Sequence, residues 1–519
     1  MAEPSEKLAD SLEVLRELQQ DKGFVAVQTN EISRIHRERL MKNGFLKEVA
    51  KGWYIVTNPS DQQGDTTAWY TTYWQFCSRY LQEKYGDEYT VSAEQSISLH
   101  AGDNTVPNQM IIRAQKGSNK VIPLLLKTSL FIMKSSLPNM AEVEVKNGIR
   151  SLTLASALIH CAPTMYERNA TDMRTALAQI TNSSEVTRLL LEGSHSIIAG
   201  RLAGAFRNIG QARIADDIIK TMEAADFKIR ETDPFVEKSK IKLSFRERSP
   251  YANRVRLMWA DKREVVLKHF PIEPGIPTDA EKYLKSIDEI YVTDAYHSLS
   301  IEQYVVSVEL IEKVRGGNWD LENEEDKKHR DAMAARGYYQ TTQAVRESIK
   351  KILAGKNPGK VLDYDHSDWY RALFEPSVTV GILRAADLAG YRNRPVFISD
   401  SQHVPMNKDA VIDVMPILFE LLEQEVNAGV RAVLGHFIFV YIHPYIDGNG
   451  RMGRFLMNAM LASGGYPWTV IPVEERDQYM KTLEEASVSG NIEPFAKFLS
   501  YLVQESLKGT PVATIKSDL

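Results

Sequence analysis

The pattern of apolar and polar positions predicts a small helical unit with a hairpin at the start of the chain. Apolar residues recur near helical spacing in SEKLADSLEVLRELQ, at Leu8, Leu12, Val14, Leu15 and Leu18. Gly23 is expected to end this helix. A second helix is predicted over EISRIHRERLMKNG, with Thr29 or Asn30 as its N-cap. Two apolar runs then surround Lys51 and Gly52, which indicates a β-hairpin and, for residues 1–60, the plan of a winged helix-turn-helix.

The next region mixes helix and strand patterns. TTAWYTTYWQFCSRYLQEKYG predicts an aromatic helix, NQMIIRA and TSLFIMK predict strands, and helical periodicity runs from Leu152 to about Phe227. We therefore expect an α+β domain over 61–230. Residues 231–283 hold several prolines, which indicates a linker or a bridging module. Its basic residues are expected to form a solvated face: Arg246, Arg248, Arg254, Arg256, Lys262 and Arg263.

Amphipathic helices dominate the last region, residues 284–508. DAVIDVMPILFELLEQEV and RAVLGHFIFVYIH are the clearest examples. One strand-like interruption, RPVFISDSQHVPM, is centred on Asp400 and Ser401. The expected fold is mainly α, with the winged helix and the α+β domain ahead of a helical domain that carries a β-hairpin.

Composition says more about the cellular location of the protein than about its activity. The net charge is −5, so the chain has no overall basic field for nucleic acid, and any DNA contact would need a local patch. Cys77 and Cys161 lack the spacing of a disulfide framework or a zinc site. The first residues are polar, unlike a signal peptide, and charged or His residues interrupt the longest apolar stretches. We expect a soluble cytoplasmic protein without a membrane contact, and the oligomeric state stays open.

The densest group of polar residues lies in HPYIDGNGRMGR, residues 443–454. Pro444 should end the preceding helix because proline cannot donate the next backbone hydrogen bond. Gly448 and Gly450 permit positive φ and a close approach of the backbone to a ligand. Helical propensity resumes after them, so this turn is expected to enter a helix N-terminus. Free N–H groups and the helix dipole would then form an anion-binding nest.

Charged residues around this turn suit phosphate chemistry. Arg451 and Arg454 are three positions apart, so both guanidiniums would lie on one helix face above a chain of phosphates. Asp447 could hold a divalent metal that bridges phosphate oxygens. His443 can accept a proton from an incoming hydroxyl. Each residue alone is better explained by a glycine turn between two helices, with a core histidine and two surface arginines, and only their combination predicts a site.

The same stretch resembles the signature of Fic proteins, HxFx(D/E)GNGRxxR, and departs from it at Tyr445, where the family usually has Phe. The resemblance covers about 284–500. It implies transfer of AMP from ATP to a Ser, Thr or Tyr hydroxyl of a target protein, with release of pyrophosphate. It makes His443 the general base and Asp447 the ligand of Mg²⁺. It also implies an anion nest and a clamp on the β and γ phosphates, formed by Gly448, Asn449, Gly450, Arg451 and Arg454.

A second stretch, YHSLSIEQY, resembles the inhibitory helix of many Fic proteins, (S/T)xxxE(G/N). Ser298 and Glu302 match this pattern, and Gln303 departs from it. The resemblance implies that Glu302 pairs with Arg454 and takes the place that the γ-phosphate needs. The alternative is a solvent-facing Glu on an amphipathic helix, and how tightly Gln303 lets the helix fit stays open.

Two further features bear on the site. In the Fic family a hairpin docks the target segment by main-chain pairing, which makes 396–404 a candidate flap. The candidate docking residues are Val396, Phe397, Ile398 and His403. His436 lies about two helical turns before His443, and we expect it to be a packed structural residue.

The front half carries a weaker resemblance. SRIHRERLMKNGFLKEVAKGWYIV is similar to the start of AbiEi-type antitoxins, in which a winged helix precedes a sensor-like domain. Between positions 34 and 51, six basic and two acidic side chains give a local net charge of +4. This patch could track a DNA backbone, or the winged helix could serve protein contact alone.

The leading hypothesis is an ATP- and Mg²⁺-dependent protein adenylyltransferase, restrained by Glu302. Two alternatives stay open. The same site could transfer another phosphate-containing group or remove AMP, with Glu302 positioning a water. The chain could instead be a regulator that binds DNA through residues 34–51 and uses its Fic part to sense ATP and modify itself.

Overall fold

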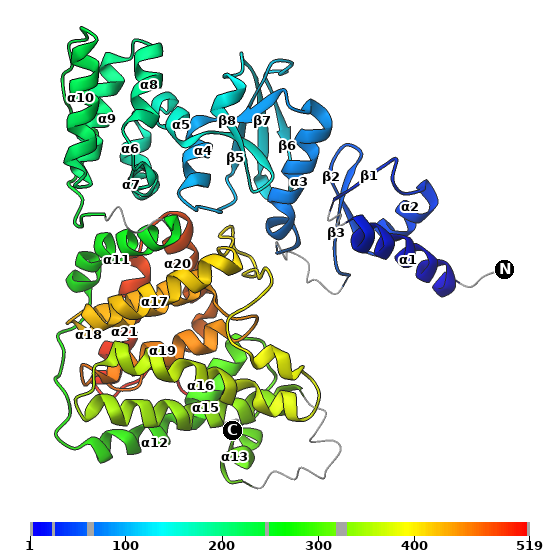
Figure 1. The fold of residues 1–519 in the computed structure, drawn as a ribbon. Helices are drawn as coiled ribbons and strands as arrows, with labels where there is room; N and C mark the ends of the chain where they lie inside the picture. The colour runs from blue at the N-terminus through cyan, green and yellow to red at the C-terminus, as the bar shows by residue number, and fades with distance from the viewer. Residues whose placement is uncertain (1–3, 23–25, 60–66, 244–248, 318–329, 516–519) are drawn as a thin grey trace. The chain divides into compact units, whose positions relative to one another are not determined.

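The computed structural model divides into two compact units (Figure 1). It describes residues 4–22, 26–59, 67–243, 249–317 and 330–515. Unit 1 comprises Met1–Arg254 and the segment Phe397–Val404, and unit 2 comprises Val255–Val396 and Pro405–Leu519. The chain therefore passes between the units three times. Every helix in the described ranges is too short or too polar to cross a bilayer.

Unit 1 begins with the predicted order of helices and hairpin. Its elements are α1 (Pro4–Lys22), β1 (Ala26–Gln28), α2 (Arg34–Lys42), β2 (Leu46–Ala50) and β3 (Trp53–Val56). The strands form an antiparallel sheet in the order β1-β3-β2, and Gly52 takes a positive φ of 80° in the β2–β3 turn. Leu15 of α1 and Leu40 of α2 pack into the core on this sheet. The predicted helix end at Gly23 lies outside the described residues, and the winged-helix assignment stays a prediction.

The predicted N-cap of α2 is wrong. Ser33, and not Thr29 or Asn30, caps this helix, and its hydroxyl accepts a hydrogen bond from the backbone N–H of His36. Thr29 is engaged elsewhere, because its hydroxyl donates to the carbonyl of Gly52 in the hairpin turn. A long-range contact therefore removes the capping residue that the local pattern favours.

A mixed sheet follows, covered by an aromatic helix. The elements are α3 (Thr67–Tyr85), β4 (Tyr89–Val91), α4 (Ala93–His100), β5 (Gln109–Ala114), β6 (Lys120–Pro123), β7 (Ser129–Lys134), β8 (Val143–Lys146) and β9 (Ile149–Leu152). Four strands are ordered β4-β5-β7-β6, with β5 and β7 parallel. Trp69, Tyr73 and Phe76 of α3 fill the core. Helices complete unit 1: α5 (Leu154–His160), α6 (Met165–Arg168), α7 (Ala170–Gln179), α8 (Ser184–Glu192), α9 (Ser196–Asn208) and α10 (Ala212–Ala224).

The segment Phe397–Val404 belongs to unit 1, although unit 2 supplies the chain on both sides of it. Val404 packs against the core of the mixed sheet, and the backbone N–H of Val106 donates to the carbonyl of Gln402 at 2.9 Å. The predicted β-hairpin is here a turn without paired strands. Pro395 and Pro405 flank the segment and cannot donate ladder hydrogen bonds, which explains why two facing strands do not form.

Unit 2 is built from helices. They are α11 (Pro250–His269, which begins in unit 1), α12 (Ala280–Ile301), α13 (Val308–Arg315), α15 (Arg330–Leu353), α16 (Pro358–Thr379), α17 (Lys408–Gln424), α18 (Ala428–Ile442), α19 (Asn449–Ala462), α20 (Arg476–Val488) and α21 (Glu493–Leu507). Short 3₁₀ turns occur at Ala385–Leu388 and Val473–Glu475. The mainly helical fold expected for this region is confirmed.

Helix α11 occupies much of the region expected to be a linker. Its basic residues do not form a solvated face, because Arg254 and Lys262 are buried. Arg256 pairs with Glu420 at 2.6 Å, and Arg263 pairs with Glu425 at 2.7 Å. Acidic partners therefore hold these arginines within the fold. The predicted domain boundaries themselves stay predictions.

Helix α18 lies at the centre of unit 2. All of its residues except Val440 are buried, and it packs against α17, α19, α20 and α21. Gly435 allows this closeness, because a Cβ there would lie 2.9 Å from a methyl of Leu422 and 3.0 Å from one of Leu456. The rigid pair α18 and α19 holds the loop between them, residues 443–448, and that loop contains the candidate site.

Candidate active site

The candidate base lies where α18 ends. His443 is the C-cap of α18 and has left-handed backbone angles, φ 54° and ψ 61°. Its ring Nδ1 lies 3.2 Å from the carbonyl of Val440. This contact assigns the ring hydrogen to Nδ1, which leaves Nε2 free to accept a proton. The predicted end of the helix just before Pro444 is confirmed.

Electrostatics keep this histidine neutral. Burial lowers the pKa of His443 to about 4, and the charge of Arg392 acts in the same direction. The carboxylates of Glu302 and Asp447 oppose that shift without cancelling it. At pH 7 the ring is therefore uncharged and can act as a base.

Gly448 makes the turn into α19 possible. It is the N-cap of α19 with a positive φ of 79°, and a Cβ there would lie 2.8 Å from the ring of Phe374. Asn449, the first residue of α19, is buried. Its side chain accepts from the backbone N–H of Tyr445 and donates to the carbonyl of Tyr445, both at 2.9 Å. The Asn449 side chain therefore fastens the loop, and only its backbone is left for an anion nest.

Tyr445 anchors this loop as the Phe of the family pattern would. Its ring is fully buried and stacks on Tyr370, with centroids 3.8 Å apart and planes 6° from parallel. Burial raises the pKa of Tyr445, so the phenol stays protonated. The Phe-to-Tyr departure thus leaves the anchoring role intact.

The carboxylate of Glu302 lies against the first turn of α19. A Cβ on Gly450 would come within 2.2 Å of Glu302 Oε1, so only glycine leaves room for this carboxylate. A helix N-terminus favours negative charge through its free N–H groups and its dipole. The Glu302 carboxylate therefore lies where the start of α19 favours negative charge.

The Arg454 side chain forms hydrogen bonds to both residues of the predicted inhibitory pattern, Ser298 and Glu302. Its Nε donates to Ser298 Oγ at 2.9 Å, and its Nη2 donates to the Ser298 carbonyl at 3.0 Å and to Glu302 Oε1 at 2.8 Å. Burial acts to lower the pKa of Arg454, but the Glu302 carboxylate, together with Tyr479 and Tyr338, outweighs burial, and that pKa is raised. Burial likewise acts to raise the pKa of Glu302, and Arg454 reverses the shift. Both groups are charged at pH 7.

Gln303 stands at the end of α12 where the family pattern has Gly or Asn, and the helix end keeps its shape with this residue. Glu302 is the C-cap of α12, and Gln303 after it has a positive φ of 64°. The backbone N–H of Tyr304 then donates to the carbonyl of Leu299 at 3.1 Å, which closes the helix end. A residue with a side chain pays about 1 kcal/mol or more for this left-handed conformation. Gln303 in place of Gly or Asn therefore strains the turn, but the hydrogen bond that closes the helix end still forms.

Arg451 is enclosed by two rings that sequence reasoning missed. Its guanidinium lies 5.0 Å from the ring centre of Tyr304 and 5.1 Å from that of Phe374, and the side chain is buried. These rings stabilise the cation and orient it. Tyr304 and Phe374 belong to no motif, so only the fold brings them to Arg451.

Asp447 is the exposed member of the group. Its Oδ1 accepts from the backbone N–H of Gly448 at 2.6 Å, and its Oδ2 lies 3.6 Å from Arg451 Nη2. Its side chain is 60% exposed, which leaves carboxylate lone pairs free for a cation. Among the residues with described positions, no three His, Cys, Asp or Glu side chains gather as a self-sufficient metal site.

His436, whose spacing from His443 left a second catalytic histidine conceivable, is packed in the core as expected. It is fully buried, its Nε2 lies 2.8 Å from the hydroxyl of Tyr479, and its ring stacks on Phe495. Burial lowers the pKa of His436 to about 4, so it packs as a neutral ring.

The candidate docking residues are not equally accessible. Phe397 is 39% exposed, and Val396 and Ile398 are half-buried. His403 is buried inside unit 1, so its side chain is not accessible to a target in this structure. Docking of a target by this segment stays a prediction.

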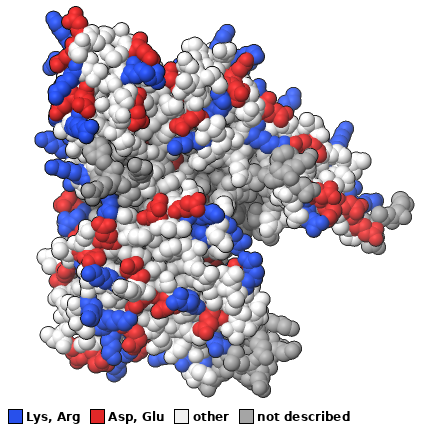
Figure 2. Space-filling view, viewed as in Figure 1, with Lys and Arg blue, Asp and Glu red and all other residues white. Residues whose placement is uncertain are grey.

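Half of the basic patch over 34–51 is engaged within unit 1. Arg34 pairs with Glu38 at 2.6 Å. Arg37 lies over the ring of Tyr54, and Arg39 donates to the hydroxyl of Ser11 at 2.8 Å. The visible face in Figure 2 shows basic and acidic side chains interspersed. The exposed lysines that complete the patch are Lys42, Lys47 and Lys51.

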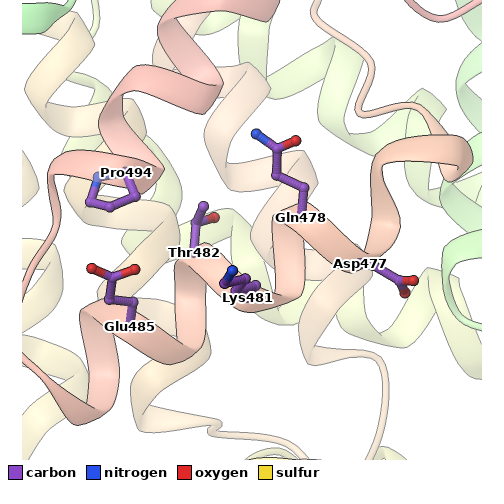
Figure 3. Close-up of a pocket in the computed structure, with 6 residues that line it drawn as sticks. All are labelled: Asp477, Gln478, Lys481, Thr482, Glu485 and Pro494. Atoms are coloured by element: carbon purple, nitrogen blue, oxygen red, sulfur yellow. The ribbon is translucent and has the colours of Figure 1, made fainter.

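A pocket of about 430 Å³ lies along α20 and the start of α21 (Figure 3). None of the motif residues lines it; the lining residues are Asp477, Gln478, Lys481, Thr482, Glu485 and Pro494. Both Lys481 and Glu485 stand on the same side of α20 in the close-up. This pocket is therefore separate from the candidate active site.

Comparison with known proteins identifies the part of the chain that holds this geometry. Residues 366–461 match the Fic/DOC family. This part of the chain is a Fic domain. The Fic domain includes the loop 443–448 and most of α19, whereas Ser298 and Glu302 lie outside the matched residues. The resemblance of the front half to AbiEi-type antitoxins is not confirmed.

Two curated proteins that are similar to this chain share the description "Protein adenylyltransferase Fic". The chain is 25% identical over 237 residues to "Protein adenylyltransferase Fic" of Nematostella vectensis, which covers 45% of this chain and 52% of that protein. It is 34% identical over 121 residues to the protein of that description from Drosophila willistoni, covering 22% and 24%. The chain thus spans about half or less of the length of these relatives. Among solved structures, Fic-1 from C. elegans is 17% identical with a TM-score of 0.37, covering 67% of this chain and 97% of that one.

Proposed function

We propose that this chain is a protein adenylyltransferase, which transfers AMP from ATP to a hydroxyl group of a target protein. The observation that supports it most is a neutral histidine, His443, beside a glycine turn and a helix N-terminus that carries two buried arginines. This group of residues lies within the Fic domain, which supports the same activity.

The transfer step follows from the roles of these groups. His443 Nε2 takes the proton from the hydroxyl of a Ser, Thr or Tyr side chain. The hydroxyl oxygen then attacks the α-phosphorus of ATP and forms the new P–O bond. The bond between the α-phosphorus and the oxygen that bridges to the β-phosphate breaks, and pyrophosphate leaves with the electron pair. A neutral base held at a rigid helix end favours this proton transfer.

The remaining residues hold the leaving group. The backbone N–H groups at the start of α19 and the guanidiniums of Arg451 and Arg454 suit the β and γ phosphates. Asp447 would hold Mg²⁺ together with those phosphates, because Mg²⁺ is usually bound by one or two carboxylates plus substrate oxygens. Bound there, the ion would neutralise charge that builds up on the leaving pyrophosphate.

Glu302 would restrain this activity. Its carboxylate occupies the mouth of the nest at Gly450 and binds Arg454, so the γ-phosphate loses both of these partners. ATP bound without them would present its α-phosphorus out of line for attack. Misplacement of about 1 Å at a reacting centre can cost ~10²-fold in rate.

The test uses ATP labelled in two positions. A Glu302→Gly variant is incubated with ATP labelled at the α- or the γ-phosphate, and with cell extract as a source of targets. Label from the α position should appear on protein, and mass spectrometry should find an added AMP group. Labelling from the γ position alone would show a kinase and overturn the proposal.

Removal of AMP is a second candidate activity at the same site. The observation in its favour is that the Glu302 carboxylate faces the anion nest, where it could also orient a water molecule. Wild-type protein would then release AMP from modified targets, and Glu302→Gln would stop that release. We do not extend the proposal to DNA binding, because the arginines of the patch over 34–51 are engaged within unit 1.

A further inference from the structure

A buried arginine outside every motif holds the catalytic loop. Arg392 is only 3% exposed, and its Nε donates to the carbonyl of His443 at 2.8 Å. Its Nη2 donates to the carbonyl of Met406 and lies 3.5 Å from that of Ile442. Its own backbone N–H donates to the carbonyl of Pro444 at 2.9 Å. One residue thus contacts the last residue of α18, the catalytic histidine and the proline after it.

The acceptors of this guanidinium are backbone carbonyls, which is unusual for a buried charge. Burial lowers the pKa of Arg392 to about 10, so the side chain stays charged at pH 7. Removing a charge from water is costly unless strong partners replace the water. The C-terminal end of α18 supplies them, because its free carbonyls carry the negative end of the helix dipole.

His443 needs such a partner. Its left-handed backbone, φ 54° and ψ 61°, is unfavourable for a residue with a side chain. Strained conformations of this kind persist only where the surroundings fix them. The hydrogen bond from Arg392 Nε to the His443 carbonyl fixes the peptide plane that follows the strained residue.

Arg392 also closes the base of the candidate flap. Arg392 precedes the segment 396–404 and Met406 follows it. The guanidinium of Arg392 donates a hydrogen bond to the backbone carbonyl of Met406. The same side chain therefore ties two residues of unit 2 that flank this segment, Arg392 itself and Met406, to the loop that carries His443.

We propose that Arg392 is a positioning residue for AMP transfer, which holds His443 in its left-handed conformation and fixes the base of the flap to the catalytic loop. This inference rests on the proposed adenylyltransferase activity. Arg392 acts through His443 and touches no reacting atom.

The experiment compares variants in the Glu302→Gly protein, where the restraint is absent. Arg392→Met keeps the length of the side chain and loses its charge and its donors. We expect kcat for AMP transfer to fall by ~10²-fold, because the base is misplaced, while the KM for ATP stays within about twofold. Arg392→Lys keeps the charge but not the forked geometry, so its kcat should lie between those of Arg392→Met and the parent. Arg394→Met, an exposed arginine of the same segment, should match the parent.

The outcomes separate this inference from the proposed function. A parent protein that transfers no AMP rejects the proposed function. A parent that transfers AMP with Arg392→Met at the same kcat rejects the positioning role. Thermal unfolding of each variant shows whether it folds. If Arg392→Met is unfolded, Arg392→Lys decides: a lower kcat at unchanged KM supports the role, and the parent's kcat, or a loss confined to KM, overturns it.

Discussion

Glu302 Oε1 and Arg454 Nη2 lie 2.8 Å apart, although 152 positions separate the two residues in the chain. This ion pair joins the C-cap of α12 to the first half of α19, and Ser298 on α12 completes it through Arg454 Nε. A carboxylate and a guanidinium that are both largely buried depend on each other, because loss of one leaves the other with an uncompensated charge. Loss of Glu302 alone would therefore leave a buried guanidinium that a new anion, such as a phosphate, could neutralise.

Removal of the base should stop the chemistry and spare nucleotide binding. We expect His443→Ala to lower AMP transfer by at least ~10²-fold, the usual scale for a general base. ATP binding, measured by calorimetry on the Glu302→Gly protein with and without this change, should be similar. His436→Ala is no control here, because His436 packs in the core. Near-normal transfer by His443→Ala would reject the assignment of the base.

Removal of the restraint should release activity. Glu302→Gly is expected to raise auto-modification by ~10²-fold, since phosphate can then align on Arg454. The gain should vanish when His443→Ala is added. Glu289→Gln, at an exposed position of the same helix, serves as the matched control and should behave as wild type. Equal auto-modification by wild type and Glu302→Gly would rule out the restraint.

Relief of the strain at Gln303 should tighten the restraint. Gln303→Gly places the residue without a Cβ at a φ of 64°. We expect the free energy of unfolding to rise by up to about 1 kcal/mol and basal auto-modification to fall. Gln303→Val, which tolerates this conformation poorly, should do the opposite. Chemical denaturation and labelling from α-labelled ATP measure the two effects. A less stable glycine variant would contradict the strain.

Gly450 and Glu302 should be coupled in stability. Gly450→Ala would place a Cβ within 2.2 Å of Glu302 Oε1, and we expect a loss of about 1–3 kcal/mol in the free energy of unfolding. In the Glu302→Gly protein the same alanine has room, so its cost should be much smaller. A double-mutant cycle by denaturant unfolding measures this coupling. An equal cost in both backgrounds would show that the carboxylate does not lie at Gly450.

The pH dependence of transfer should reflect a depressed histidine pKa. The base works in its neutral form, and burial lowers the pKa of His443 to about 4. The rate of the Glu302→Gly protein should therefore stay level from pH 7 to about 5 and fall as the pH drops through about 4. Loss of Glu302 removes a charge that raises this pKa, so the fall should not move to higher pH. Circular dichroism at each pH checks that the protein stays folded, and a half-maximal rate near pH 6.5 would contradict the prediction.

The sequence predicted those parts of the site that are local in the chain. The helix stop before Pro444, the glycine turn and the start of α19 all depend on residues within a dozen positions, so backbone chemistry alone decides them. Ser298 and Glu302 came from the resemblance of YHSLSIEQY to the inhibitory pattern of Fic proteins. Arg392, Tyr304 and Phe374 were missed, because their roles come from packing between distant segments.

Two local features of the chain have simple physical causes. The prolines of 231–283, the expected linker or bridging module, partly delimit a helix: Pro250 is the first residue of α11, where proline fits well, and Pro271 follows its end. The apolar run at Val396–Ile398 favours a strand, but a strand needs a partner ladder. In unit 1 the carbonyl of Gln402 is paired with Val106 instead.

The membership of Phe397–Val404 in unit 1 has a consequence for how this protein can be divided or recombined. No single cut separates the two units, since a chain that begins at Val255 still contains Val404 without the core that Val404 packs against. Gln402 would likewise lose its donor, the N–H of Val106. An exchange of the front half with that of a relative would therefore have to include the eight residues Phe397–Val404 in order to keep these contacts.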